Sequence, residues 1–214
     1  MSRRSFHRAG EAERRHDLIA ATLDCIFERG LQGATVREIA ARAGVTQGLI
    51  RHYFSSKDQM LRAAYKEVIA GMTRDAATPD EENQSNARSR LRTFIIANLT
   101  PPVVDGRTLS LWAAFVSQVR VDPVFAEIHR EGYLAFRTAL ETLVADVFAE
   151  AGRDPDPAEC RELAIAINGM IDGLWLEGTL VGDLFSKTPL SGIAIRSVEA
   201  LLGGIRLTGN EEPS

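Results

Sequence analysis

The side chains best suited to molecular recognition lie between residues 35 and 57. If this stretch is helical, Gln47 and Arg51 share a face because they are four residues apart, and Gly48 and His52 flank them. An arginine can donate two hydrogen bonds to guanine O6 and N7, and a glutamine can pair with adenine. These residue types at this spacing indicate a helix that reads base edges in the major groove of DNA.

Neighbouring polar residues suit the phosphate backbone. Donors on His52, Tyr53 and Lys57 can bind phosphate oxygens, which holds a protein in register without reading sequence. Gly48 would let the backbone come close to DNA, and the hydroxyl of Thr35 at a helix start suits another phosphate. The predicted DNA-binding residues are Thr35, Thr46, Gln47, Gly48, Arg51, His52, Tyr53 and Lys57. The alternative is two short helices with ordinary solvated faces.

Two short capped helices must position these side chains. Thr35 and Glu38 fit a capping box that starts the first helix, Gly44 ends it, and Thr46 can cap the second. Apolar residues on the inner faces are expected to pack together, namely Ile39, Ala40, Ala43, Ile50 and Phe54. This is the layout of a helix-turn-helix, which presents its second helix to the major groove.

The whole chain is predicted to be all-α, with a three-helix N-terminal head followed by a larger helical domain. Apolar residues recur at spacings of three and four residues, as they do on one face of a helix. No stretch alternates apolar and polar residues as a half-buried strand does. We expect about nine helices. Their predicted ranges are 12–28, 35–44, 46–54, 56–73, 89–99, 108–121, 123–150, 157–181 and 189–203. The polar, turn-rich residues 76–87 are expected to form a connection.

Composition and charge fit a cytoplasmic protein with a basic end. The 214 residues are 45% hydrophobic, and Cys25 and Cys160 match no metal or redox spacing, so we predict no metal site and no cofactor. No secretory signal and no membrane span is predicted. Residues 1–57 hold ten basic and six acidic side chains, a net charge of +4, whereas residues 58–214 hold fifteen and twenty-three, a net of −8. Local positive potential is what phosphate affinity requires.

The helix-turn-helix region resembles the DNA-binding domain of the TetR family of bacterial repressors. The shared pattern is a threonine before the second helix, I-A-x-x-A-G-V-[ST] across the turn, a small residue two past that cap, and H-[YF]-F-x-x-K. The matching residues are Thr35, Ile39, Ala40, Ala43, Gly44, Val45, Thr46, Gly48, His52, Tyr53, Phe54 and Lys57. The resemblance covers residues 12–65 and implies a DNA-binding head on a helical regulatory domain.

Arg51 departs from the common pattern of this family. Many members carry tyrosine at this position, so a generic phosphate contact there is not carried over to this chain. Arginine is instead well suited to guanine. We therefore expect an altered base preference.

The C-terminal part resembles the BetI-type subgroup, whose named member senses choline. The resemblance lies in LSLWAAFVSQVRVDPVFAEIH and in INGMIDGLWLEGTLVG, the second of which contains I-D-G-L-W at residues 171–175. It implies a domain that binds a small molecule and forms a dimer. The predicted domains are a flexible arm at 1–11, a DNA-binding domain at 12–57, a ligand-binding and dimerisation domain at 58–207 and a disordered tail at 208–214.

Small and apolar residues of the last two helices predict a dimer interface. Gly169 and Gly173 lie four apart and let another helix approach closely. The predicted interface residues are Gly169, Gly173, Leu176, Leu180, Ile195, Val198 and Leu202. Two such helices from each of two chains would form a four-helix interface. A two-fold dimer would read half-sites about 34–36 Å apart or at a related spacing.

The same domain carries a candidate ligand site. Trp112 and Phe115 are three residues apart, as are Asp172 and Trp175, so facing helices would bring aromatic rings and a carboxylate together. Such a cluster suits a quaternary ammonium, through cation–π attraction of about 0.5–2 kcal/mol per ring. The candidate residues are Trp112, Phe115, Phe136, Asn168, Asp172 and Trp175. The alternative is that the aromatics are ordinary core residues and Asp172 serves the dimer contact.

These features predict a ligand-responsive dimeric repressor that a small molecule releases from a two-fold operator. The protein is expected to have no enzymatic activity. Its expected partners are double-stranded operator DNA, a second copy and an effector such as choline, with no membrane. The family resemblance implies that the ligand moves the helix over residues 56–73. A small all-α enzyme or an interaction protein without DNA binding is the alternative. Against an enzyme, the chain lacks a phosphate-binding glycine loop, HExxH and GxSxG.

Overall fold

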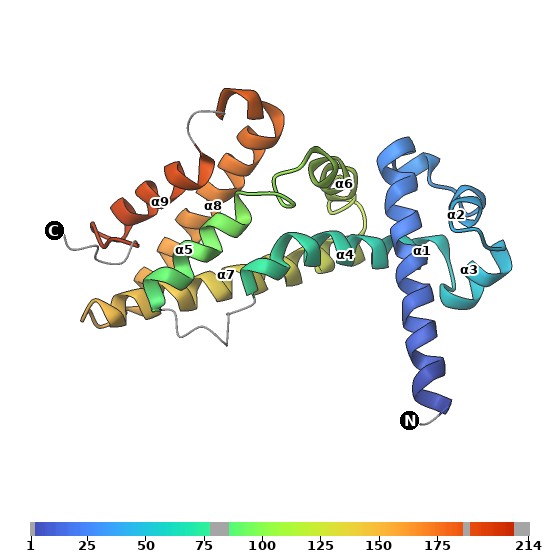
Figure 1. Cartoon of the computed structure of the whole chain (residues 1–214), viewed down its shortest axis with the longest axis horizontal. Helices are drawn as coiled ribbons and strands as arrows, with labels where there is room; N and C mark the ends of the chain where they lie inside the picture. The colour runs from blue at the N-terminus through green and yellow to red at the C-terminus, as the bar shows by residue number, and fades with distance from the viewer. Residues whose placement is uncertain (1–2, 78–85, 186–188, 208–214) are drawn as a thin grey trace. The chain divides into compact units, whose positions relative to one another are not determined.

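The computed structural model describes residues 3–77, 86–185 and 189–207, and within them it holds nine α-helices, one 3-10 helix and no strand (Figure 1). This confirms the predicted all-α class. The elements are α1 (Arg3–Gly33), α2 (Val36–Arg42), α3 (Gln47–Tyr53), α4 (Lys57–Ala77), α5 (Ala87–Asn98), α6 (Gly106–Val116), α7 (Pro123–Glu150), α8 (Pro157–Leu180), η1 (Gly182–Phe185) and α9 (Leu190–Leu201). The predicted tail lies outside the described residues.

The helices form two compact units, each built from two stretches of chain. The first comprises Met1–Ile69 and Ser110–His129, and the second comprises Ala70–Leu109 and Arg130–Ser214. The division differs from the sequential boundary expected after residue 57. The first unit also takes in early α4, late α6 and early α7, because their aromatic side chains pack on one another.

The first unit has an aliphatic core and an aromatic one. The aliphatic core lies where α1, α2 and α3 meet, with Leu18 and Ile39 fully buried. In the aromatic core the ring of Tyr65 lies 5.0 Å from that of Phe115 and 5.7 Å from that of Phe125. These contacts join α4 to α6 and α7 inside the same unit.

The second unit is formed by α5, the C-terminal part of α7, α8 and α9. Its fully buried residues include Leu91, Leu140, Val144, Ile167, Ala194 and Val198. Gly178 allows α8 and α9 to cross closely, because a Cβ there would lie 2.1 Å from Cδ1 of Leu190. No helix among the described residues is long and apolar enough to span a membrane.

Local capping groups set most helix ends, as expected. Oδ1 of Asp122 accepts a hydrogen bond from Val124 N at 2.8 Å where α7 begins, and Oδ1 of Asp156 accepts one from Ala158 N at 3.1 Å where α8 begins. Oγ of Ser56 accepts one from Gln59 N at 3.1 Å at the start of α4. The predicted ranges for these helices therefore agree closely with the structure.

The start of α1 and the end of α6 differ from the prediction, whereas the predicted end of the first helix at residue 28 lies next to Gly30, whose backbone is non-helical. Residues 3–11 form helical backbone instead of a flexible arm. α6 ends at Val116 instead of residue 121, because the chain beyond it forms tight turns, with Gln118 N donating to Phe115 O at 2.9 Å. Such turns keep a helix-like pattern of apolar residues, so the sequence pattern does not distinguish them from helix.

A polar contact joins α4 and α7 at the edge of the aromatic core. The residue Tyr65 is 0% exposed, and its Oη lies 2.8 Å from Nδ1 of His129. Burial raises the pKa of Tyr65 to about 12 and lowers the pKa of His129. The hydroxyl therefore keeps its proton, and it donates to Nδ1 in the tautomer of the neutral ring that carries its proton on Nε2.

We predict that this contact makes folding stability fall under acidic conditions. His129 stays neutral in the folded chain while the unfolded chain takes up a proton below pH about 6.5, so stability decreases as pH falls through that value. His129→Gln keeps an acceptor for Tyr65, so we expect a stability within about 1 kcal/mol of wild type near pH 7.5. Thermal melting from pH 7.5 down to about 5 should then show a weaker pH dependence for this variant.

The exposed His16 provides the control for this experiment. His16→Gln removes a histidine without touching the aromatic core, and it should melt as wild type does at each pH. An equally steep pH dependence in wild type and His129→Gln would contradict the assignment.

Candidate nucleic-acid interface

One glycine and one threonine shape the turn between α2 and α3. Gly44 has φ +64°, in the left-handed region that favours glycine, and it allows Val45 N to donate to Ala40 O at 3.0 Å. Oγ1 of Thr46 then accepts a hydrogen bond from Leu49 N at 3.2 Å and caps α3. The predicted turn and cap are both present.

Buried side chains decide which face of α3 points inward. Ile39 of α2 is 0% exposed, and Ile50 and Phe54 are each 2% exposed. Ile50 and Phe54 lie four residues apart, so they turn one side of α3 towards the core. Four predicted DNA-binding residues of α3 are all exposed, namely Gln47, Gly48, Arg51 and His52.

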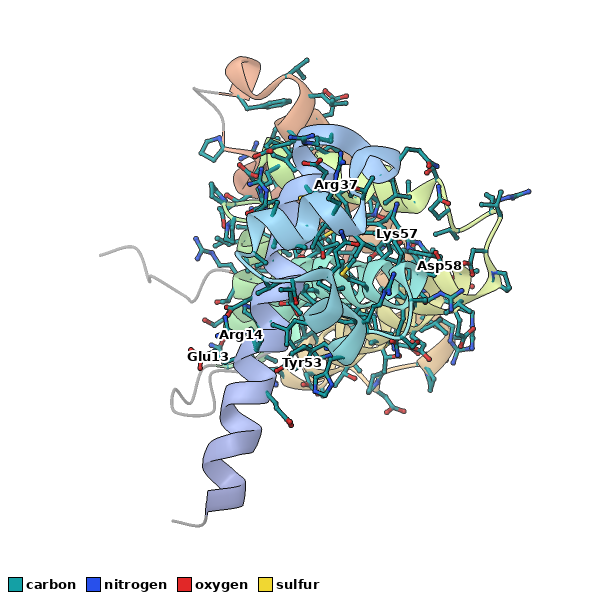
Figure 2. The ribbon with its side chains drawn as sticks, turned by 90° about the vertical axis from the view of Figure 1, so that its right-hand side faces the viewer. Glu13, Arg14, Arg37, Tyr53, Lys57 and Asp58 are labelled. Atoms are coloured by element: carbon teal, nitrogen blue, oxygen red, sulfur yellow. The ribbon has the colours of Figure 1, made fainter. Side chains whose placement is uncertain are left out.

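The remaining predicted DNA-binding residues lie at helix ends. Thr35 and Thr46 are exposed, and Tyr53 and Lys57 are partly exposed. Figure 2 shows Tyr53 and Lys57 at the surface of the first unit. Each threonine oxygen accepts a bond from its own helix, so the hydroxyl hydrogen is the part that can reach a phosphate.

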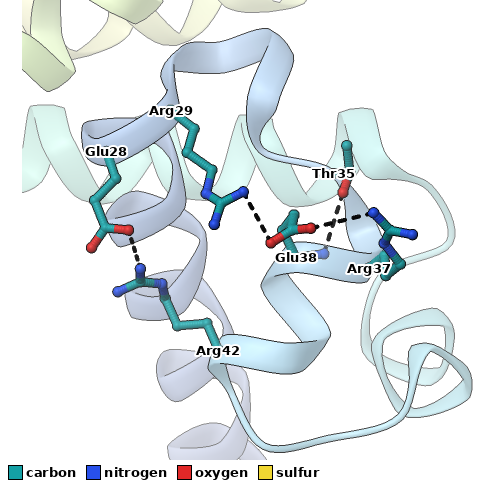
Figure 3. A network of polar contacts seen from close by, with 6 residues as sticks. All are labelled: Glu28, Arg29, Thr35, Arg37, Glu38 and Arg42. Carbon is teal, nitrogen blue, oxygen red and sulfur yellow. Dashed lines mark hydrogen bonds and ion pairs between the residues drawn. The ribbon is translucent and has the colours of Figure 1, made fainter.

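Only one half of the capping box predicted for α2 forms. Oγ1 of Thr35 accepts from Glu38 N at 3.2 Å, as expected. The Glu38 carboxylate pairs instead with Arg29 at 3.2 Å and Arg37 at 3.5 Å, and Thr35 N donates to Gly33 O at 2.9 Å (Figure 3). The glutamate thus links α1 to α2, which the capping pattern does not predict.

Arg42 adds a second link between α1 and α2. Its guanidinium contacts Glu28 and lies 3.7 Å from Asp24, both on α1 (Figure 3 shows the first pair). Exposed ion pairs contribute about 0–1 kcal/mol each. The links therefore favour one placement of α2 on α1 and add little to the stability given by the core.

Arg37 is a basic residue of this surface that the sequence reasoning missed. Its side chain is 81% exposed in the first turn of α2. Figure 2 shows it at the surface of the first unit that also carries Tyr53 and Lys57. Its position two residues after Thr35, at a predicted phosphate-facing helix start, is the signal that could have identified it.

In the second unit, Asn168 brings part of the predicted ligand site together. Its side chain is 2% exposed, and Nδ2 donates to Oη of Tyr133 at 2.8 Å and to Oδ2 of Asp172 at 3.0 Å. The Asp172 side chain reaches the surface, yet the protein atoms around it exclude enough water to raise its pKa, against the Asn168 hydrogen bond. A carboxylate that is incompletely solvated favours a nearby cation.

The predicted aromatic residues take separate places. Trp175 is 5% exposed and its Nε1 donates to Val103 O at 2.8 Å, so its indole is held in the core of the second unit. Phe136 packs on Phe94 with ring centres 5.0 Å apart in that unit. Phe115 stacks on Tyr65 in the first unit, which also contains the half-buried Trp112. The convergence of all these aromatics around one ligand stays a prediction.

The predicted dimer residues divide into surface and core groups. Gly169 and Gly173 are exposed, with no other atom within 4 Å of the place that a Cβ would take, and Leu180 is 68% exposed. Val198 and Leu202 are 0% and 1% exposed. They face the core of their own unit, so their assignment to a partner-facing surface was wrong. The partly exposed positions are Leu176 and Ile195.

Comparison with known proteins now identifies the family. Residues 18–64 match the family model of bacterial regulatory proteins of the tetR family, and residues 87–203 match the model of the C-terminal domain of BetI-type transcriptional repressors. The chain belongs to the TetR family. It is a transcriptional regulator of the BetI type, and the predicted absence of an enzyme class agrees with its relatives.

Individual members of the TetR family are similar over most of the chain. A BetI regulator from Burkholderia thailandensis is 31% identical over 88% of this chain and 93% of its own, and one from Burkholderia cenocepacia is 33% identical over 88% and 94%. A crystal structure described as a transcriptional regulator from Pseudomonas aeruginosa PAO1 is 31% identical, with a TM-score of 0.80 over 90% of this chain and 92% of that chain.

A more distant structure shares the fold. It is a regulator from Saccharomonospora viridis in complex with choline, 19% identical, with a TM-score of 0.67 over 90% of this chain and 96% of that chain. At this identity the likeness supports the TetR fold alone.

We predict that Arg51 of this TetR-family head reads guanine. Arg51→Ala should weaken binding by about 1–3 kcal/mol at sites with guanine at the contacted position and much less where that guanine is replaced. His52→Ala provides a comparison, because loss of a phosphate contact weakens all sequences alike. Affinities measured on a guanine-scanned site would test this, and an equal loss at every sequence for Arg51→Ala would contradict base reading.

Proposed function

We propose that the protein is a dimeric repressor that binds a two-fold operator and releases it when a small organic cation binds the second unit. The observation that carries the DNA-binding part is the presentation of α3. Ile50 and Phe54 are buried, and Gln47 and Arg51 are exposed. Side chains that donate to base edges thus stand on a helix held by the core, as base reading in the major groove requires.

The exposed side of α8 supports a dimer. Ile165 is 47% exposed and Leu180 is 68% exposed, and the open surface at Gly169 and Gly173 lies between them along the helix. These positions follow one helical stripe. Large exposed apolar residues around a small-residue surface are suited to a close helix–helix contact. A two-fold dimer would place two copies of α3 on two half-sites of an operator.

The Asn168 cluster supports a cationic effector. Asn168 orients the Asp172 carboxylate and the Tyr133 hydroxyl, and the Tyr133 side chain is 39% exposed. A carboxylate beside an accessible aromatic ring is the chemistry that attracts a quaternary ammonium group. A protein of the same fold was crystallised with choline, so choline is the first compound to test.

Release of DNA requires that the effector bind one state better than the other. A typical coupling between two sites is about 1–3 kcal/mol, which changes DNA affinity by roughly 5- to 150-fold. α4 is the element through which the two functions are connected along the chain, because its residues up to Ile69 belong to the first unit and its later residues to the second.

Selection of bound DNA from a random pool tests the proposed function directly. We expect recovery of a two-fold symmetric sequence, with affinity that falls steeply as salt rises, because phosphate contacts release counterions. Repeating the selection with choline, betaine aldehyde and a polyamine should weaken recovery with one of them. Recovery of no preferred sequence at any salt concentration would reject the repressor function.

We predict that Gly173→Leu separates the dimer without unfolding the subunit. The position is open in the single chain, so the added side chain can only obstruct a partner. Overpacking costs about 1–3 kcal/mol, and the dimer dissociation constant should rise by roughly 5- to 150-fold. Sedimentation equilibrium measures this. Gly71→Leu, at an exposed glycine of α4 that is equally open, should leave the dimer unchanged.

We predict that Asp172→Asn abolishes the response to choline. The amide keeps the size of the carboxylate but removes the charge that attracts a cation. Wild type should gain about 2.7 kcal/mol of stability at a choline concentration 100 times the dissociation constant, and the variant should gain none. Glu177→Gln, at an exposed carboxylate five residues further along α8, is the matched control. If no cation changes melting or DNA binding of wild type, the effector proposal fails while the repressor proposal stands.

A further inference from the structure

A positive charge lies beside the aromatic member of the Asn168 cluster. Arg137 follows Tyr133 by four residues on α7, so the two side chains share one side of the helix. The Arg137 guanidinium lies 5.9 Å from the centre of the Tyr133 ring, within the range of a cation–π contact. Tyr133 thus has a guanidinium over its ring and the Asn168 amide at its hydroxyl.

The carboxylate that is best placed in the sequence to neutralise Arg137 pairs with another residue. Glu141 follows Arg137 by four residues, a spacing at which opposite charges attract on a helix. Its Oε1 instead lies 3.5 Å from Nε of Arg161 on α8. Among the residues that the structure describes, Arg137 forms no ion pair, and it is partly exposed. Its charge is therefore available to an anionic group from outside the chain.

A negative charge lies near the hydroxyl end of the same tyrosine. Nδ2 of Asn168 donates to Oη of Tyr133 at 2.8 Å and to Oδ2 of Asp172 at 3.0 Å, so one amide holds the hydroxyl and the carboxylate. Within the described chain Asp172 and Arg137 form no ion pair with each other, so the two charges stay apart. Tyr133 is 39% exposed. A small molecule that lies along Tyr133 would therefore meet a carboxylate and a guanidinium.

We propose that the effector is a zwitterion, which places an ammonium group at Asp172 and a carboxylate at Arg137. The proposal rests on the proposed cationic effector and names a second group that this effector carries. A guanidinium presents a planar fork of donors that matches the two oxygens of a carboxylate. Its hydrogen bonds to a carboxylate are stronger than a cation–π contact at an exposed ring. A carboxylate can therefore replace the Tyr133 ring as the partner of Arg137.

Arg137 would select against a ligand that is only a cation. Without a carboxylate on the ligand, the guanidinium stays over the Tyr133 ring, where it competes for the ring and repels a second positive charge. A ligand with a carboxylate draws the guanidinium away and leaves the ring to the ammonium group. The same arginine thus weakens the binding of choline and strengthens the binding of a betaine. A residue with only a structural role would change both affinities in the same direction.

The experiment measures by calorimetry how tightly four ligands bind to wild type and variants. Glycine betaine carries both charges, and a homologue with a longer methylene chain carries them further apart. Choline lacks the carboxylate, and the tert-butylacetate anion lacks the positive charge because carbon replaces the nitrogen of glycine betaine. Wild type should bind one of the two betaines about 10- to 150-fold more tightly than choline, as expected for hydrogen bonds between charged groups.

Each variant should remove one preference. Arg137→Gln should bind neither betaine more tightly than choline, and it should bind choline at least as tightly as wild type does. Arg137→Lys keeps the charge without the planar fork, so it should keep a reduced preference for the betaines. Asp172→Asn should lose the preference for glycine betaine over the tert-butylacetate anion, because these two ligands differ in the positive charge.

Arg153→Gln is the matched control. The Arg153 guanidinium also lies over an aromatic ring of the second unit, 4.0 Å from the centre of Phe148. Phe148 follows Tyr133 by fifteen residues, about 22 Å along α7. This variant loses the same charge at a distance from the Asn168 cluster, so it should keep the wild-type dissociation constants for all four ligands. Circular dichroism checks that every variant remains helical.

The outcomes separate this inference from the proposed function. Wild type that binds choline as tightly as either betaine would overturn this inference alone, because the cationic effector requires only Asp172. Arg137→Gln that weakens betaine and choline binding by the same factor would also overturn it alone. Failure of all four ligands to bind wild type would overturn the cationic effector and this inference together. A preference for a betaine that depends on Arg137, in a protein that selects no DNA, would support this inference and reject the repressor function.

Discussion

The rotation of α3 about its own axis is the constraint on which the rest of the DNA-binding surface depends. It is set by the burial of Ile50 and Phe54, which together are worth about 3–6 kcal/mol at the usual 1.5–3 kcal/mol for a buried apolar side chain. The exposed ion pairs around Arg42 are each worth about 0–1 kcal/mol. Apolar burial therefore decides that Arg51 faces outward, and the charged network only refines how α2 lies on α1.

The same principle operates in the second unit with a polar group. Asn168 is almost fully buried, so its amide must be hydrogen-bonded, and it finds Tyr133 and Asp172. That requirement draws a carboxylate and an aromatic hydroxyl together at one place on α7 and α8. Trp175 satisfies its indole N–H at Val103 and serves the core. The chemistry available to a cation in this unit thus comes from the partners of a buried amide more than from the tryptophan.

The chain belongs to a family of transcriptional regulators, and some of its side chains distinguish it within that family. Arg51 places an exposed guanidinium, a group suited to guanine, on α3 of a TetR head. Positive charge acts over about 8 Å at physiological salt, so its effect depends on where it lies and not on the net charge of −4.

The amino-acid sequence by itself determined the all-α class, the caps at Thr46, Asp122 and Asp156, and the positions of Gln47 and Arg51 on one helical face. These follow from hydrogen bonds and periodicities within a few residues of chain, which a sequence pattern records directly. Only the tertiary structure decided that Val198 and Leu202 belong to the core, and that Glu38 pairs with Arg29 and Arg37. The reason is that an amphipathic helix has one apolar stripe whether it faces its own subunit or a partner, and a charged side chain has several neighbours within reach until packing selects among them.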